Sequence, residues 1–179
     1  MKTIIIGNSG SGKTWLATRL AANTETSIVH LDDIFWQPGG FDEKRPADEV
    51  DRLIAHSKQN SSWIVEGVFG ELAERYFPEA DLLIWLDIEW AICHARLMAR
   101  GSESKRHMGR VQAEEGLRIL VEWASRYYER QDLRSFTGHQ TLIRKFPGAT
   151  LHLSCEEDVN RLIGSAYHVA PLVADRSPR

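Results

Sequence analysis

A glycine-rich loop near the start of the chain constrains its fold more than any other feature. The segment at 7–14 reads GNSGSGKT and directly follows the apolar run TIII at 3–6. It fits the pattern G-x-x-x-x-G-K-[ST], in which backbone N–H groups and a helix N-terminus surround a polyphosphate. Lys13 is then expected to reach the β- and γ-phosphates of ATP, and the Thr14 hydroxyl to ligate Mg²⁺. The predicted ATP-binding residues of the loop are Gly7, Asn8, Ser9, Gly10, Ser11, Gly12, Lys13 and Thr14.

The apolar runs of the chain predict the rest of the fold. Five of them lie at 3–6, 27–31, 63–67, 81–87 and 150–154, and they are nearly continuous rather than alternating. Such runs are typical of strands that are covered on both faces. Helical patterns lie between or after them, at 13–22, 43–59, 88–100, 113–130 and 156–166. This alternation predicts an α/β three-layer sandwich with a parallel sheet, as a single domain over 1–169 with a frayed tail at 170–179.

Composition excludes several classes of protein. No apolar run approaches the roughly 20 residues of a membrane span, and the first run is short for a signal peptide, so we expect a cytoplasmic protein without a membrane partner. Cys93 and Cys155 have no metal-ligand spacing. The net charge of −3 argues against a chain that binds duplex DNA over its whole surface. A local basic patch stays open, because the segment 96–134 contains nine of the 22 Lys and Arg residues.

Acidic side chains follow or end two further predicted strands. Asp32 and Asp33 come after the run at 27–31, and Glu66 lies in the run at 63–67. Because the carboxyl ends of parallel strands meet at one edge of the sheet, we expect all three beside the glycine-rich loop. Asp32 and Asp33 are candidates for a general base toward an acceptor hydroxyl and for a metal-side carboxylate, and both have the alternative of plain turn residues. Trp36 is a candidate floor for the acceptor pocket, with core packing as its alternative.

The segment 101–113 reads GSESKRHMGRVQA and separates two helical patterns. Its glycine, serine and charge content predicts a lid. Arg106 and Arg110 are expected to close on the transferring phosphoryl group, because charge there counts most once water is expelled. A solvated flexible loop is the alternative. The predicted substrate-binding residues are therefore Asp32, Asp33, Trp36, Glu66, Arg106 and Arg110.

The segments IIIGNSGSGKTWLATRLA, HLDDIFWQPG, WIVEGVF, ADLLIWLD and CHARLMAR resemble the small P-loop kinases related to adenylate kinase, in particular the DNA topology modulation protein group. The resemblance covers most of 1–134. It implies a P-loop NTPase kinase fold with five parallel strands in the order 2-3-1-4-5 and a lid. It also implies that Glu66 orients Mg²⁺ through water, that Arg96 and Arg100 bind ATP, and that Arg100 acts in catalysis.

Two departures from that family concern the acceptor. Gly70 stands where the third-strand motif of adenylate kinases has an arginine, and no monophosphate-clamping arginine is recognisable after the second strand. That segment, LDDIFWQPGG, resembles the acceptor region of small-molecule kinases, in which a carboxylate accepts a hydroxyl proton. The resemblance makes Asp32 the preferred general base. The sequence thus predicts an ATP- and Mg²⁺-dependent phosphotransferase with a small nucleotide, nucleoside or hydroxyl metabolite as acceptor. The alternative is an ATP-binding regulator that acts on DNA topology or a protein partner; no feature of the sequence indicates an oligomeric state.

Overall fold

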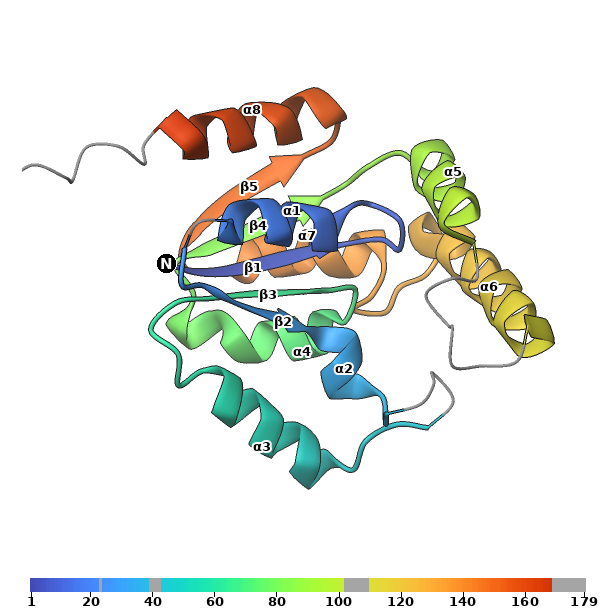
Figure 1. The fold of residues 1–179 in the computed structure, drawn as a ribbon, viewed down its shortest axis with the longest axis horizontal. Helices are drawn as coiled ribbons and strands as arrows, with labels where there is room; N and C mark the ends of the chain where they lie inside the picture. Colours follow the sequence, from blue (N-terminus) through green and yellow to red (C-terminus); the bar gives the residue numbers. More distant parts are fainter. Residues whose placement is uncertain (23, 39–42, 102–109, 169–179) are drawn as a thin grey trace, which may run out of the picture.

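The computed structural model of the chain describes residues 1–22, 24–38, 43–101 and 110–168 (Figure 1). Its centre is a sheet of five strands: β1 (Lys2–Gly7), β2 (Ser27–His30), β3 (Trp63–Gly67), β4 (Leu82–Leu86) and β5 (Ala149–Leu153). Every neighbouring pair is parallel, and the order across the sheet is β2-β3-β1-β4-β5. The predicted strand order is therefore confirmed.

Helices cover both faces of the sheet (Figure 1). One face is covered by α1 (Lys13–Ala21) and α8 (Glu156–His168), and the other by α3 (Ala47–Ser57), α4 (Gly70–Ala73), the 3₁₀ helix η1 (Glu74–Glu79) and α7 (Phe136–Lys145). Three helices lie toward the carboxyl ends of the strands: α2 (Leu31–Phe35), α5 (Trp90–Arg100) and α6 (Arg110–Ser125), which continues into the 3₁₀ helix η3 (Arg126–Tyr128). The three-layer sandwich is confirmed.

Alternation along the central strand divides the core into two halves. Ile4 and Ile6 face the α3, α4 and α7 side, where they join a cluster that includes Tyr76 and Leu142. Ile5 faces the opposite side, in a cluster with residues of α1 and α8. All three isoleucines are fully buried. Because successive side chains of a strand point to opposite faces, one continuous apolar run supplies both halves of the core.

Several helices differ from the sequence-based expectations. The predicted helix at 43–59 begins only at Ala47, directly after Pro46, which suits the first turn of a helix because it has no N–H to leave unpaired. The short helix α2, the α4–η1 segment and α7 were not predicted. Helix α7 carries a sequence signal that could have revealed it, since the Ser135 hydroxyl accepts a 3.2 Å hydrogen bond from the Gly138 N–H as an N-cap.

The predicted lid lies mostly outside the described residues. Its residues 102–109 are among those not described, while α6 already begins at Arg110, so the last four positions of the predicted lid are helical. The predicted tail at 170–179 also lies outside the described residues. Among the helices that are described, none combines the length and apolar character that crossing a membrane requires.

Candidate functional site

The loop between β1 and α1 has a backbone that requires glycine at two positions. Gly10 and Gly12 have φ angles of +82° and +99°, in the region that side chains other than glycine rarely adopt. A Cβ on Gly10 would also lie 2.4 Å from the carbonyl oxygen of Cys93 in α5, which is closer than real contacts allow. The loop therefore holds a wrapped conformation and packs directly against α5.

Asn8 organises the loop from within. Its side-chain oxygen accepts a 2.8 Å hydrogen bond from the Ser9 N–H, and its backbone carbonyl accepts one of 3.2 Å from the Ser11 N–H. Its side-chain amide donates a 3.0 Å hydrogen bond to the carbonyl of Ala124 in α6. The same residue thus shapes the loop and connects it to the helix that follows the predicted lid.

Lys13 extends back across the loop. Its Nζ donates a 2.8 Å hydrogen bond to the Asn8 carbonyl, so the ammonium lies beside the loop N–H groups. Burial lowers the pKa of Lys13, while the nearby carboxylates of Glu66 and Asp32 oppose that change. The loop, an ammonium and two carboxylates therefore meet at one place on the carboxyl edge of the sheet.

Glu66 is the most buried carboxylate of this group, with a side chain 5 % exposed. Its Oε1 accepts a 2.8 Å hydrogen bond from the Thr14 hydroxyl and lies 2.6 Å from His30 Nδ1. Burial acts to raise the pKa of Glu66, but the hydrogen bonds from His30 and Thr14 and the charge of Lys13 outweigh it and leave the pKa below its ordinary value. The same hydrogen bond raises the pKa of His30. Glu66 is therefore held as the ionised form, which suits a metal-side carboxylate.

Asp32 and Asp33 occupy different environments although they are adjacent in α2. Asp32 is partly buried, and burial raises the pKa of its carboxyl group against the opposing charge of Lys13. Asp33 is exposed, and its backbone carbonyl accepts a 3.0 Å hydrogen bond from Arg45 Nε. Of the two carboxylates, Asp32 is the one whose charge acts on Lys13.

A cavity beside the loop is a candidate site for the base of a nucleotide. The cavity has a volume of about 410 Å³, and its lining includes Gly12, Trp15, Arg96 and Glu156. Arg96 donates a 3.0 Å hydrogen bond to the Ser11 carbonyl and pairs with Glu156, which comes just after β5. Arg96 thus connects the loop to the far edge of the sheet and forms one wall of the cavity.

Several solved structures of kinases are similar to this chain, although its sequence matches no known family. No family model and no curated protein matches the sequence. A sugar kinase from Janibacter sp. HTCC2649 aligns at 15 % identity over 98 % of this chain and 98 % of that chain, with a TM-score of 0.47. Deoxyadenosine kinase from M. mycoides, with bound dATP, aligns at 15 % identity over 94 % and 98 %, with a TM-score of 0.49.

A third solved structure is similar enough to support a shared fold. It is a "putative kinase" from Chloroflexus aurantiacus J-10-fl, at 16 % identity over 93 % of this chain and 96 % of that chain, with a TM-score of 0.55. The chain has the P-loop kinase fold. In this fold the loop after β1, the end of β3 and the start of α2 share one edge, where the structure places Lys13, Glu66 and Asp32.

The remaining predicted residues lie around this edge or outside the described residues. Arg100 is the exposed last residue of α5, and its charge contributes to lowering the pKa of Lys13. Trp36 makes edge contacts with Phe35 and Phe69, with ring centroids 4.6 Å and 6.5 Å apart. Arg106 lies outside the described residues, as does the side chain of Arg110. The roles expected for these four residues stay predictions.

A Mg²⁺ ion at this edge of the sheet would have few protein ligands. Among the residues that the structure describes, no group of three His, Cys, Asp or Glu side chains forms a metal cage. Thr14 and Glu66 instead offer a hydroxyl and a carboxylate oxygen 2.8 Å apart beside the loop. Mg²⁺ prefers such oxygen ligands and usually takes its others from water and substrate phosphates, so these residues fit it.

Sequence reasoning missed two parts of the site. His30 was not among the predicted site residues, yet it is the register partner of Glu66 across β2 and β3 and contacts its carboxylate. The second part is a set of side chains from α4, α6 and the segment before α7, centred on Arg130 and Arg134. Neither could be found from local patterns, because each depends on which strands and helices lie side by side.

Proposed function

We propose that the chain is an ATP- and Mg²⁺-dependent phosphotransferase that acts on a hydroxyl group of a small acceptor. The observation that carries this proposal is the grouping of Lys13, Thr14, Glu66 and Asp32 around a loop that wraps as a phosphate-binding loop does. The P-loop kinase fold and the cavity beside the loop support it.

Each residue has a distinct part in the proposed reaction. The loop N–H groups and Lys13 hold the β- and γ-phosphates and offset their charge. Mg²⁺, when bound by Thr14 and oriented by Glu66, would neutralise charge that develops on the phosphate oxygens. The nucleotide base enters the cavity beside Trp15 and Arg96. A cytoplasmic location, as expected from the sequence, would supply the ATP.

Asp32 is the proposed general base. The acceptor oxygen attacks the γ-phosphorus, the bond from that phosphorus to the β–γ bridging oxygen breaks, and ADP leaves. The acceptor proton passes to the Asp32 carboxylate. A pKa raised by burial improves Asp32 as a proton acceptor, and the charge of Lys13 limits that increase. Positioning and electrostatic stabilisation supply most of the rate in this class of reaction.

The regulator alternative finds less support in the structure. A DNA-binding surface needs cations that are free to neutralise phosphates. Within the described part of segment 96–134, most arginines instead lie within 4 Å of a carboxylate: Arg96, Arg118, Arg126, Arg130 and Arg134. We therefore favour the enzyme.

A nucleotide titration and a transfer assay test the proposal. The wild-type chain is expected to bind Mg²⁺-ATP and to phosphorylate at least one acceptor in a panel of nucleosides, nucleotides and hydroxyl metabolites, read by mass spectrometry. Lys13→Ala is expected to lower kcat by at least about a hundredfold, because one preorganised charge on the transferring group is lost. Lys145→Ala removes an exposed lysine of α7 and serves as the matched control. Full activity of the Lys13→Ala protein, or no ATP binding by the wild type, would overturn the proposal.

A further inference from the structure

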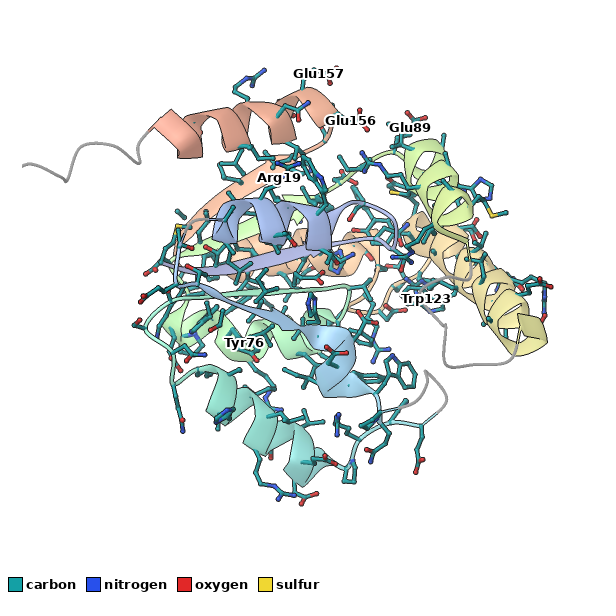
Figure 2. All side chains as sticks on the ribbon, viewed as in Figure 1. Arg19, Tyr76, Glu89, Trp123, Glu156 and Glu157 are labelled. Carbon is teal, nitrogen blue, oxygen red and sulfur yellow. The ribbon has the colours of Figure 1, made fainter. Side chains whose placement is uncertain are left out.

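A second cavity lies beside the proposed catalytic edge. Its volume is about 350 Å³, and its lining residues are Glu71, Trp123, Arg130, Asp132, Leu133 and Arg134. Trp123 projects from the part of α6 nearest the sheet (Figure 2). The cavity is separate from the one beside Trp15, which has none of these lining residues.

Two contacts connect this cavity to the catalytic edge. The carbonyl of Ala124, next to Trp123 in sequence, accepts the 3.0 Å hydrogen bond from the Asn8 side chain in the phosphate-binding loop. The guanidinium of Arg134 lies 4.4 Å from the ring centroid of Phe35, in the same short helix as Asp32. Arg134 of the cavity wall therefore contacts the helix that carries the proposed base, and the sequence neighbour of Trp123 contacts the loop that would hold ATP.

The charged walls of the cavity are held in place by their neighbours. The Arg130 guanidinium lies over the Trp123 ring, 3.7 Å from its centroid, and donates a 2.8 Å hydrogen bond to the Arg134 carbonyl. Arg134 donates to Glu71 Oε1 from two nitrogens and lies over Phe69 as well as Phe35. A planar guanidinium fixed in this way has one set of donor directions. The cavity is thus organised before any ligand enters.

The cavity offers both donors and acceptors of hydrogen bonds. The side chains of Arg130 and Arg134 are 15 % and 26 % exposed, and those of Glu71 and Asp132 are 35 % and 51 % exposed. A ligand in the cavity therefore meets guanidinium donors and carboxylate acceptors together. This combination indicates a ligand that both accepts and donates hydrogen bonds.

Charge and hydrogen-bonding capacity narrow the class of ligand. Arg130 and Arg134 are balanced by Glu71 and by Asp132, whose Oδ2 lies 3.7 Å from Arg130 Nη1. A phosphate or carboxylate offers acceptors alone, so it would lie beside the carboxylates of Glu71 and Asp132 without a hydrogen bond to either. An ammonium offers donors alone. A hydroxyl group can do both, and neighbouring hydroxyl groups can bond to the arginines and to the carboxylates at once.

We propose that this cavity binds the acceptor through its hydroxyl groups, and that the acceptor is an uncharged polyhydroxy compound, a free sugar, a cyclitol or a nucleoside. The inference rests on the proposed function, because a phosphotransferase with Asp32 as base needs a hydroxyl on its acceptor. The hydroxyl groups bound by Arg130 and Glu71 orient the molecule, and a different hydroxyl of the same molecule meets Asp32. Phosphorylated acceptors are excluded by the charge balance of the cavity.

Direct binding measurements test this inference. The probes are D-ribose, D-glucose, myo-inositol and adenosine, each paired with its monophosphate ester. A non-hydrolysable ATP analogue is present at saturation, so that adenosine and AMP do not report the nucleotide cavity. Saturation-transfer NMR detects binding and calorimetry gives Kd. At least one polyhydroxy probe is expected to bind, about tenfold or more tightly than its own monophosphate.

Two conservative variants locate the binding site. Arg130→Lys keeps the positive charge and removes the planar guanidinium donors, whereas Glu71→Gln keeps an acceptor for Arg134 and replaces one carboxylate oxygen by a donor. Each is expected to raise the Kd of the bound probe about tenfold or more, since a hydrogen bond to a charged group is lost. Arg126→Lys is the matched control, because Arg126 is 60 % exposed and is not part of the cavity lining.

The outcomes are distinguishable from those that test the proposed function. Binding of none of the polyhydroxy probes, tighter binding of the monophosphates, or equal Kd values in wild type, Arg130→Lys and Glu71→Gln would each overturn the acceptor assignment. Titration of the ATP analogue alone reports the nucleotide site. Failure of that titration with intact sugar binding would overturn the proposed function, and with it the acceptor role, while showing that the cavity binds polyhydroxy compounds.

Discussion

Thr14 and Glu66 are 52 residues apart in sequence, yet the Thr14 hydroxyl donates a 2.8 Å hydrogen bond to Glu66 Oε1. This contact joins the last residue of the phosphate-binding motif to the end of β3, the strand that pairs with β1. His30 reaches the same oxygen from β2. Two adjacent strands and helix α1 therefore contribute to the surroundings of one carboxylate.

Replacing Glu66 by Gln is expected to weaken the use of Mg²⁺. The amide keeps the size of the side chain but removes the negative charge, so the Mg²⁺ concentration for half-maximal transfer should rise about 10- to 100-fold. Magnesium titration of the initial rate measures this change. Glu79→Gln, at an exposed carboxylate that pairs with Lys2 and Lys58, is the control and should leave the titration unchanged. An unaltered Mg²⁺ requirement in Glu66→Gln would contradict the role of Glu66.

Replacing Asp32 by Asn is expected to lower kcat by about 10²- to 10⁴-fold, because the acceptor proton loses its base. Steady-state kinetics with the acceptor separate this loss from a binding effect. Asp33→Asn, in the exposed neighbouring position, provides the comparison. Replacing a general base lowers kcat, whereas replacing a residue that only binds the acceptor raises KM. A raised KM with an unchanged kcat for Asp32→Asn would argue against general-base catalysis.

The same residue predicts a pH dependence. Asp32 must be ionised to accept a proton, and burial raises its pKa above the ordinary aspartate value of 3.8. The rate should therefore fall as pH decreases through this raised pKa, at a higher pH than an exposed aspartate would require. The kcat/KM profile of the wild type should show this acidic limb, and the residual activity of Asp32→Asn should lack it.

The pair of His30 and Glu66 predicts how stability changes with pH. The pKa of His30 is raised above 6.5, so its contribution is complete below pH 6.5 and is lost as pH rises through the raised value. The pKa of Glu66 is lowered below 4.5, so its contribution is complete above pH 4.5 and is lost as pH falls through the lowered value. The pair therefore stabilises the fold most between about pH 4.5 and 6.5.

Urea denaturation of the wild type and of His30→Gln measures this effect. The difference in the free energy of unfolding should be larger at pH 5.5 than at pH 9, because the charge on His30 is lost as pH rises through its raised pKa. His56→Gln on α3 is the matched control. An equal difference at both pH values would show that the His30–Glu66 contact does not depend on charge.

A chain of buried hydrogen bonds runs through the Tyr127 hydroxyl, so removing this hydroxyl is expected to lower the free energy of unfolding. Trp85 Nε1 donates to the Tyr127 oxygen at 3.0 Å, the Tyr127 hydroxyl donates to His139 Nδ1 at 2.7 Å, and His139 Nε2 donates to the Val68 carbonyl at 3.0 Å. Burial lowers the pKa of His139 to about 3, so the ring is neutral and can accept the Tyr127 proton. This chain connects η3 and α7 to the segment just after β3.

Tyr127→Phe should lower the free energy of unfolding by about 1–3 kcal/mol, because it leaves buried groups of Trp85 and His139 unpaired. Tyr128→Phe is the matched control: its side chain is 46 % exposed and its hydroxyl donates a 3.3 Å hydrogen bond to Asp87. The control should cost less than about 1 kcal/mol, since water can replace an exposed hydrogen bond. Chemical denaturation compares the two, and equal costs would contradict the importance of burial here.

Local patterns in the sequence were sufficient for the loop, the five strands and most of the long helices. The loop motif and a continuous apolar run such as 3–6 act over a few residues, so their consequences can be predicted without knowing what lies beside them. The strand order followed from the resemblance to P-loop kinases rather than from local pattern. The short helix α2 and the α4–η1 segment escaped prediction because a single turn has too few residues to show a helical period.

What the tertiary structure alone decided is which side chains meet. His30 contacts Glu66 because β2 and β3 pair in that register, and a shift of one residue would send the two side chains to opposite faces of the sheet. Arg134 contacts Glu71 across 63 residues, because the turn before α7 lies beside α4. Such contacts depend on burial and packing summed over the whole chain, which no short stretch of sequence encodes. The sequence by itself therefore determined the glycine-rich loop and predicted a phosphate there, and the assembled fold determined what lies beside that loop.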